Sequence, residues 1–277
     1  MLPRQVGYAR PTTVDEAISL LASNEGARAL AGGQTLVSVM KARAASPDAV
    51  IDLNGIEDLR GIELRPDGGL EIGAMTTYTE ICESAEARAR PILGEVCAQI
   101  ADVQVRNRGT IGGNICANDP TNHLPPLMVA VGAEMTIAGA SGERTVSAEE
   151  FFLGVYLTAV GPGELLTKIT IPPGRRDGFA SVTIGREGTC IVCAAVGLDG
   201  GPRIAIGCVD AVPHRATDVE ARLNGDPAAA VEGLGATLDP PGDVHAPADY
   251  RRHLAEVVVA RAIAQAQGQT TEGRGGG

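Results

Sequence analysis

A chain of 277 residues exceeds the usual size of one domain, and its 44% hydrophobic and 21% charged residues are typical of a folded, soluble protein. The net charge of −11 and the pI near 4.9 exclude nucleic acid and anionic membranes as partners, because either would need a basic face. No apolar run approaches the roughly 20 residues that cross a bilayer, and residues 1–5 lack the apolar core of a signal peptide. We expect no membrane span and a cytoplasmic location.

The six cysteines are too sparse for a disulfide scaffold, so we expect reduced thiols. Cys190 and Cys193 have the C-x-x-C spacing of a metal or redox site, but they lie in an apolar, alternating run with no second C-x-x-C and no nearby His. The pattern favours buried strand cysteines, and no metal site is predicted. An iron–sulfur cluster needs about four neighbouring thiolates, so any metal redox centre is expected on another chain.

Helix and strand patterns mix along the first two thirds of the chain. A capping box at residues 13–16 precedes apolar residues at the spacing of a helix with one buried face. Further strands are predicted over residues 27–31, 50–53, 70–73, 134–138 and 165–171, and helices over residues 36–43, 91–101 and 125–131.

A sharp break at residues 171–178 predicts an interdomain linker with a boundary near Pro173. Three β-type runs follow over residues 179–186, 190–198 and 202–209, the last two as a hairpin, and helical patterns come next. The predicted domains are residues 1–172, with lobes of about 1–55 and 56–172, then a C-terminal domain of residues 173–267 and a disordered tail of residues 268–277.

Two glycine turns carry the chemistry of the N-terminal domain. Glycine lets backbone N–H groups approach a phosphate closely, and a helix start adds a favourable dipole. One Gly-Gly alone usually marks only a tight turn, but two such turns together suit a pyrophosphate. Neither is the G-x-G-x-x-G of a Rossmann unit or the G-x-x-x-x-G-K-[ST] of a P-loop. The predicted donors are Ala31, Gly32, Gly33, Gln34, Thr35, Thr110, Ile111, Gly112, Gly113 and Asn114.

Residues 31–41, 72–77 and 108–114 resemble the FAD-binding medium subunits of the carbon monoxide dehydrogenase and xanthine dehydrogenase family. The resemblance extends to residues 162–166 and 250–254, so it covers nearly the whole chain in order. It implies an α+β fold: a two-lobed FAD-binding domain of the PCMH type, then a smaller domain with a three-stranded antiparallel sheet and helices. It also implies that both glycine segments hold the FAD pyrophosphate and that Leu166 lies near the flavin or its adenosine.

The resemblance further implies a division of labour among three subunits. A large subunit with a molybdopterin cofactor oxidises the substrate, a small subunit with [2Fe-2S] clusters relays electrons, and this chain passes them through FAD to quinone, dioxygen or NAD. A dimer of heterotrimers is the implied assembly. The protein is then an oxidoreductase subunit that contributes cofactor contacts and no acid–base catalyst of its own.

Two positions depart from the family pattern. His123 stands where relatives often have Asp. A FAD contact is still predicted for His123, but its imidazole would carry a different charge from the Asp carboxylate. Residues 181–183 replace a Lys that relatives often carry, so no flavin contact is expected there. The cysteine-rich loop of relatives that reduce aromatic thioesters has no counterpart. Arg106 and Arg108 either neutralise a phosphate or cover a subunit surface.

Two alternatives to an electron-transfer subunit stay open. A self-sufficient flavin oxidoreductase would need its own proton-transfer group near the flavin, and no convincing set of residues is present. A nucleotide-binding or assembly module without redox activity would follow if the glycine turns were purely structural. Bound flavin and co-purifying chains distinguish the three.

Overall fold

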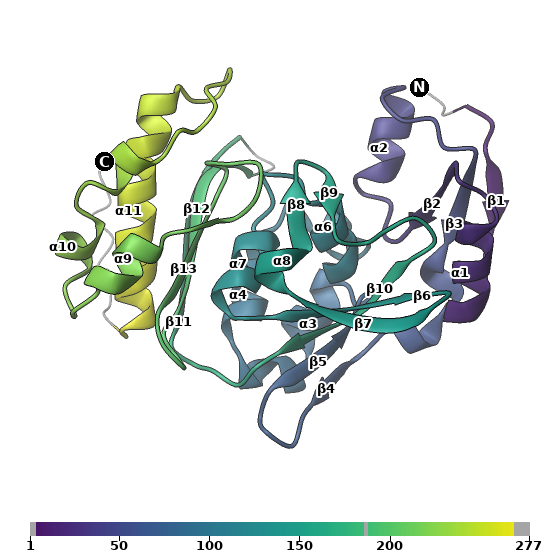
Figure 1. Cartoon of the computed structure of the whole chain (residues 1–277), viewed down its shortest axis with the longest axis horizontal. Helices are drawn as coiled ribbons and strands as arrows, with labels where there is room; N and C mark the ends of the chain where they lie inside the picture. Colours follow the sequence, from purple (N-terminus) through teal and green to yellow (C-terminus); the bar gives the residue numbers. More distant parts are fainter. Residues whose placement is uncertain (1–3, 186–187, 269–277) are drawn as a thin grey trace.

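A computed structural model describes residues 4–185 and 188–268. Its three main sheets lie in chain order along the molecule, with the N-terminal lobe at one end and the long C-terminal helix at the other (Figure 1). Within these described residues, no helix combines the length and the apolar character needed to span a membrane. Residues 269–277 of the predicted disordered tail lie outside the described residues.

The N-terminal lobe is a small parallel sheet with strand order β1-β3-β2. Parallel neighbours need crossover connections, and two helices provide them. The first helix buries Ala17, Ile18 and Leu21. The Thr13 hydroxyl accepts a hydrogen bond from the Glu16 amide, which is half of the predicted capping box, whereas the Glu16 carboxylate accepts from the Thr12 amide. The elements are β1 (Gly7–Ala9), α1 (Val14–Ala22), β2 (Ala27–Leu30), α2 (Leu36–Lys41) and β3 (Ala49–Asp52).

The second lobe is an antiparallel sheet with strand order β4-β5-β10-β6-β7, covered by helices on one face. Its strands are β4 (Ile62–Leu64), β5 (Leu70–Gly73), β6 (Glu134–Gly139), β7 (Gly142–Ser147) and β10 (Leu165–Ile171), with a separate hairpin of β8 (Phe152–Gly154) and β9 (Leu157–Thr158). Its helices are α3 (Tyr78–Glu83), α4 (Ile92–Gln99), α5 (Val103–Arg106), α6 (Ile111–Ala117), α7 (Leu124–Ala130) and α8 (Ala148–Phe151).

The central strand β10 separates two hydrophobic cores. Successive side chains of a strand point to opposite faces, so Leu165 packs into the core shared with the N-terminal lobe, whereas Leu166 packs into the core beneath the helices. The sheet therefore has one face covered by α6 and α7 and one turned toward α1.

The C-terminal domain has four antiparallel strands in the order β11-β12-β13-β14, so the prediction of three was wrong. The fourth strand has only two residues, too few to show an alternating pattern. The predicted hairpin is confirmed, since β12 and β13 pair antiparallel. The elements are β11 (Asp177–Ile184), β12 (Thr189–Gly197), β13 (Arg203–Gly207), β14 (His214–Arg215), α9 (Thr217–Arg222), α10 (Pro227–Val231) and α11 (Ala248–Ala266).

A buried ion pair joins the second lobe to the C-terminal domain. Arg90 Nε and Nη2 donate to Asp177 Oδ2 and Oδ1 at 2.8 and 2.7 Å, and both side chains are at most 4% exposed. Arg90 Nη1 also donates to the Pro172 carbonyl at 2.6 Å. Because removing one partner of a buried pair leaves an uncompensated charge, at a cost of about 3–5 kcal/mol, this contact fixes the joint between the domains.

Candidate functional site

The two glycine segments, 80 positions apart in sequence, touch in the structure. A Cβ on Gly32 would lie 1.9 Å from the Arg108 carbonyl oxygen, and a Cβ on Gly113 would lie 3.3 Å from the Ala31 Cβ. The first distance is far inside van der Waals contact with backbone, so only glycine fits at position 32. The sequence prediction that the segments act as a pair is consistent with this contact.

The first segment is an open loop between β2 and α2. Gly33 adopts φ +77°, the left-handed conformation that favours glycine. Among the hydrogen bonds of the described residues, none uses the amides of residues 32–35, and the Thr35 hydroxyl makes no cap bond to α2. Gln34 and Thr35 are exposed. The loop therefore presents a row of unpaired donors to a ligand.

The second segment is a helix start, where the sequence had indicated a turn. Gly112 and Gly113 lie in the first turn of α6, whose N-cap is Thr110. The Ile111 amide donates to the Thr76 carbonyl at 3.0 Å, and the Gly112 amide to the Ala74 carbonyl at 2.9 Å.

The remaining amides of this turn are also engaged. The Gly113 amide donates to the Thr110 hydroxyl at 3.0 Å, and the Asn114 amide to the Thr110 carbonyl at 3.0 Å. The two segments thus do not offer the same kind of donors, because the amides of the second segment are already hydrogen-bonded within the protein and hold α6 in place.

The third sequence motif, residues 72–77, is the support on which the second segment rests. A Cβ on Gly112 would lie 2.6 Å from both the Cβ and the carbonyl oxygen of Ala74. Thr77 and Thr110 form an isolated antiparallel bridge. All three motifs noted in the sequence therefore meet at one place, between the N-terminal lobe and α6.

Asn114 brings an unsatisfied polar atom to this place. Asn114 is 9% exposed and lies beside Tyr78, a phenol whose pKa burial raises. The Asn114 Oδ1 has no partner. A buried acceptor without a donor costs about 1–3 kcal/mol, which a ligand that brings a hydroxyl or amide donor would relieve.

The other two predicted cofactor contacts lie in packed surroundings. His123 is 5% exposed at the start of α7, and its ring packs edge-to-face on Phe179 of β11, 5.4 Å between centroids. Burial lowers the pKa of His123, and its Nε2 has no partner. Leu166 is 4% exposed beside Ile137. The FAD contacts of His123 and Leu166 stay predictions.

The two arginines beside the second segment differ. Arg106 donates to the carbonyls of Ile100 and Ala101 at 3.0 and 2.8 Å, which is a structural role. Arg108 is exposed, and no described residue forms an ion pair or hydrogen bond with its side chain. Its carbonyl contacts Gly32, so the backbone of this exposed arginine adjoins the first loop, whose amides are unpaired.

A polar network that the sequence did not indicate holds the first loop from behind. Asn54 Nδ2 donates to the Ala31 carbonyl at 3.0 Å and to Asp52 Oδ1 at 2.7 Å, and the Tyr8 hydroxyl donates to Asp52 Oδ2 at 2.7 Å. Asp52 at the end of the strand predicted over residues 50–53, and Asn54 just after it, were the available signal, since β2 and β3 are parallel neighbours.

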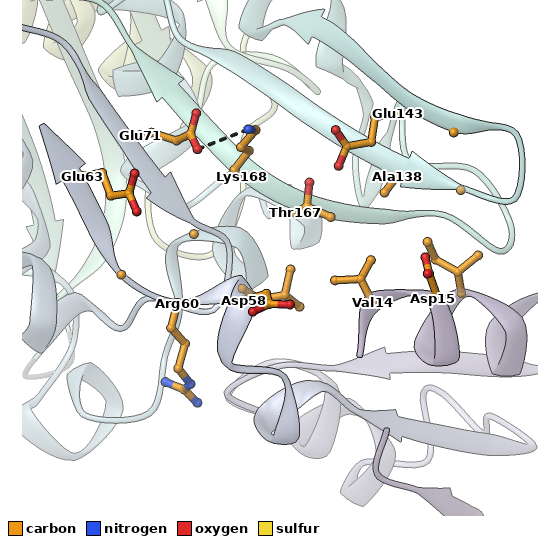
Figure 2. Close-up of a pocket in the computed structure, with 16 residues that line it drawn as sticks. Val14, Asp15, Asp58, Arg60, Glu63, Glu71, Ala138, Glu143, Thr167 and Lys168 are labelled. Carbon is orange, nitrogen blue, oxygen red and sulfur yellow. Dashed lines mark hydrogen bonds and ion pairs between the residues drawn. The ribbon is translucent and has the colours of Figure 1, made fainter. Parts of the chain in front are cut away.

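A cavity of about 420 Å³ lies elsewhere, between α1 and the open face of the second sheet (Figure 2). Lys168 pairs there with Glu71 at 3.2 Å. The carboxylates that line the cavity outnumber its two cations, Arg60 and Lys168, so the cavity would repel a phosphate. The carboxylates are Asp15, Asp58, Glu63, Glu71 and Glu143. The size of this cavity therefore does not make it the phosphate site.

Comparisons with known proteins identify the family of the chain. Residues 4–174 match the family model described as the FAD binding domain in molybdopterin dehydrogenase, and residues 189–266 match the CO dehydrogenase flavoprotein C-terminal domain. The chain belongs to the FAD-binding medium subunits of the molybdopterin dehydrogenases, oxidoreductases of the carbon monoxide dehydrogenase and xanthine dehydrogenase type.

Particular relatives match over their full length. The carbon monoxide dehydrogenase medium chain of Afipia carboxidovorans is 38% identical over 96% of this chain and 98% of its own. The glyceraldehyde dehydrogenase medium chain of Sulfolobus acidocaldarius is 33% identical over 95% and 99%. A solved carbon monoxide dehydrogenase from Hydrogenophaga pseudoflava is similar with a TM-score of 0.91 and 36% identity, covering 97% of this chain and 99% of that one.

Proposed function

We propose that this chain is the electron-transfer subunit of a multi-subunit molybdenum hydroxylase, in which bound FAD links [2Fe-2S] clusters on a partner to an external acceptor. The observation that carries the proposal is the contact between residues 31–35 and residues 108–114, which sets unpaired amides beside the backbone of an exposed arginine. The comparisons support the FAD-binding and multi-subunit parts of it.

The residues present fit a dinucleotide with two phosphates. The amides of residues 32–35 and the Thr35 hydroxyl would donate to phosphate oxygens. Arg108 would offset their charge, and Asn114 Oδ1 would accept from a cofactor hydroxyl. When bound, the isoalloxazine ring supplies the redox chemistry. The role of this chain is to hold it, and its residues are positioned for binding and not for proton transfer.

The finer assembly follows the family pattern. We propose a large subunit with a molybdopterin cofactor that oxidises the substrate, a small subunit with [2Fe-2S] clusters, and a dimer of such heterotrimers, with quinone, dioxygen or NAD as the acceptor. A cytoplasmic location is also proposed, because none of the six cysteines forms a disulfide, as is usual in a reducing compartment.

Purification of the chain with its native partners tests the proposal. We expect FAD on this chain, and iron and molybdenum on co-purifying chains, with FAD reduced by substrate only when all the chains are present. Stoichiometric FAD with turnover by the chain alone would favour the self-sufficient flavoenzyme instead. Absence of flavin after native purification would contradict both and favour an assembly module.

A further inference from the structure

The C-terminal sheet contains a bulge that changes where the C-x-x-C pair points. In a regular strand, residues i and i+3 face opposite sides. Here Val182 pairs with Val192 and Thr183 with Cys190, so Ile191 is the extra residue of a β-bulge. Ile191 and Val192 accordingly both pack into the core under α11. Cys190 and Cys193 therefore both face the second lobe.

A third cysteine reaches the same face from the end of β13. Cys208 adopts φ +68°, a left-handed conformation that is uncommon for a residue with a side chain. The preceding Gly207 pairs with Cys193, and a Cβ there would lie 2.7 Å from the Cys193 sulfur, so glycine leaves room for it. The three sulfurs of Cys190, Cys193 and Cys208 all lie within 4.8 Å of one another, and all three residues are buried.

The surroundings of these sulfurs are polar, and the Arg251 guanidinium beside them pairs with the Asp243 carboxylate at 2.6 Å. Arg251 on α11 is 5% exposed and donates to the carbonyls of Ile191 and Cys208 at 2.5 and 3.2 Å. Cys208 Sγ donates to the Pro120 carbonyl oxygen at 3.0 Å, so the cluster also adjoins the loop that precedes α7 in the second lobe.

His123 offers a nitrogen on the same face of the sheet. Its ring rests on Phe179, which pairs with Ala195 in the same core as Cys193, and it interacts electrostatically with Cys208. Its Nε2 is buried and unpaired. A buried neutral imidazole without a hydrogen-bond partner is the form that binds a metal.

We propose that Cys190, Cys193 and Cys208 bind a structural zinc ion at the joint between the two domains. The His123 ring, whose nitrogens do not lie within 4.8 Å of all three sulfurs, would move toward them to become the fourth ligand. Zinc takes thiolate and imidazole ligands in a closed tetrahedron with Zn–S near about 2.3 Å. Such a tetrahedron separates its sulfurs by about 3.8 Å, which is compatible with the observed cluster. The site ties the C-terminal sheet to the start of α7 and is separate from the glycine segments. It would use His123 as a zinc ligand in place of the FAD contact predicted for that residue.

Zinc content of the full chain, purified without chelators, tests the proposal. We expect one zinc per chain, with X-ray absorption at the zinc edge showing three sulfurs and one nitrogen. Cys193→Ser and Cys208→Ser should weaken zinc binding by more than the roughly 10–100-fold that loss of an outer-shell partner costs. Cys82→Ser is the matched control, because Cys82 is exposed and outside the cluster, and it should keep full zinc content.

Thiol labelling keeps the test decisive if a serine variant fails to fold. In the unmodified chain, zinc should protect all three cysteines from alkylation, and a chelator should expose them together while Cys82 reacts throughout. Three reactive thiols with no zinc uptake, a disulfide among them, or iron in place of zinc would overturn the proposal. Three sulfurs with water in place of nitrogen would overturn the role of His123.

Discussion

The two glycine segments of the N-terminal domain look alike in sequence but differ in structure. In the first, the amides of residues 32–35 have no partner among the described residues, and Gly33 uses the left-handed conformation. In the second, the four amides of residues 111–114 are all bonded within the protein. An amide that is already bonded cannot serve a phosphate without breaking its existing bond. The available backbone donors therefore belong to the first segment.

The difference shows that a Gly-Gly pair can meet two distinct physical needs. Gly33 is required for its backbone conformation, whereas Gly112 is required because a Cβ would strike Ala74. We infer that the first loop binds and the second supports it. Substitutions in the two segments should therefore separate a loss of FAD affinity from a loss of stability.

The largest effect is expected for Gly32→Ala. The new Cβ would meet the Arg108 carbonyl oxygen at 1.9 Å, and backbone yields less readily than a flexible side chain. Overpacking of this kind costs about 1–3 kcal/mol, equivalent to a loss of roughly 5–150-fold in affinity if the loop moves away from its binding position. Flavin content after purification and FAD titration of the apoprotein measure it. Wild-type affinity would contradict the view that contact between the loops shapes the site.

Gly112→Ala should instead act mainly on stability. Alanine in a helix is favoured over glycine by about 1 kcal/mol, but a Cβ 2.6 Å from Ala74 costs about 1–3 kcal/mol. We expect a net loss of about 0–2 kcal/mol in the free energy of unfolding, measured by urea denaturation, with a smaller loss of FAD affinity than for Gly32→Ala. Gly94→Ala in α4 is the matched control, since its nearest atom would be 3.9 Å away, and it should be neutral or stabilising.

Much of the fold follows from periodicity, because a buried face leaves a repeat in the sequence. The start of α1 and the hairpin of β12 and β13 were predicted for this reason. The start of α6 was not, because two glycines have low helix propensity. That helix forms because Thr110 caps it and the carbonyls of residues 74 and 76 accept its first amides, which are contacts distant in sequence.

The site was predictable only where residues adjacent in sequence carry it. Residues 31–35 could be recognised as a loop suited to phosphate. The support from Asn54 and the grouping of Cys208 with the C-x-x-C pair could not, because they depend on strand order and on a bulge at Ile191. Neither a bulge nor a positive φ at a cysteine leaves a distinctive pattern of residues.

Thr35→Val tests the binding role with little change in support. The Thr35 hydroxyl makes no cap bond and is exposed, so the free energy of unfolding should stay within about 0.5 kcal/mol of wild type. A hydrogen bond to a charged group contributes about 1.5–3 kcal/mol, so FAD affinity should fall about tenfold or more. Thr110→Val is the opposite case: loss of the N-cap should cost about 0.5–2 kcal/mol in stability and leave the FAD affinity of the folded protein near wild type.

The smallest effect distinguishes the segments by pH. The first is held by an ionised network: burial raises the pKa of Asp52, but hydrogen bonds from Asn54 and Tyr8 outweigh it, and the net pKa lies below the ordinary 3.8. A lowered folded-state pKa means that its stabilisation is present above about pH 4 and is lost as pH falls through the lowered value. The bonds of residues 111–114 involve no titrating group and should persist.

We therefore expect FAD retention to decline below about pH 4, through the Asn54 contact to Ala31, before α6 loses its support. Asp52→Asn should remove the part of this decline that arises from the network, at the expense of slightly weaker binding at neutral pH. Fluorescence of released flavin measures FAD retention as a function of pH, with Glu86→Gln as the control for a remote carboxylate of lowered pKa. Equal acid profiles for Asp52→Asn and Glu86→Gln would mean that Asp52 does not hold the loop, and that contact with the Arg108 carbonyl alone positions it.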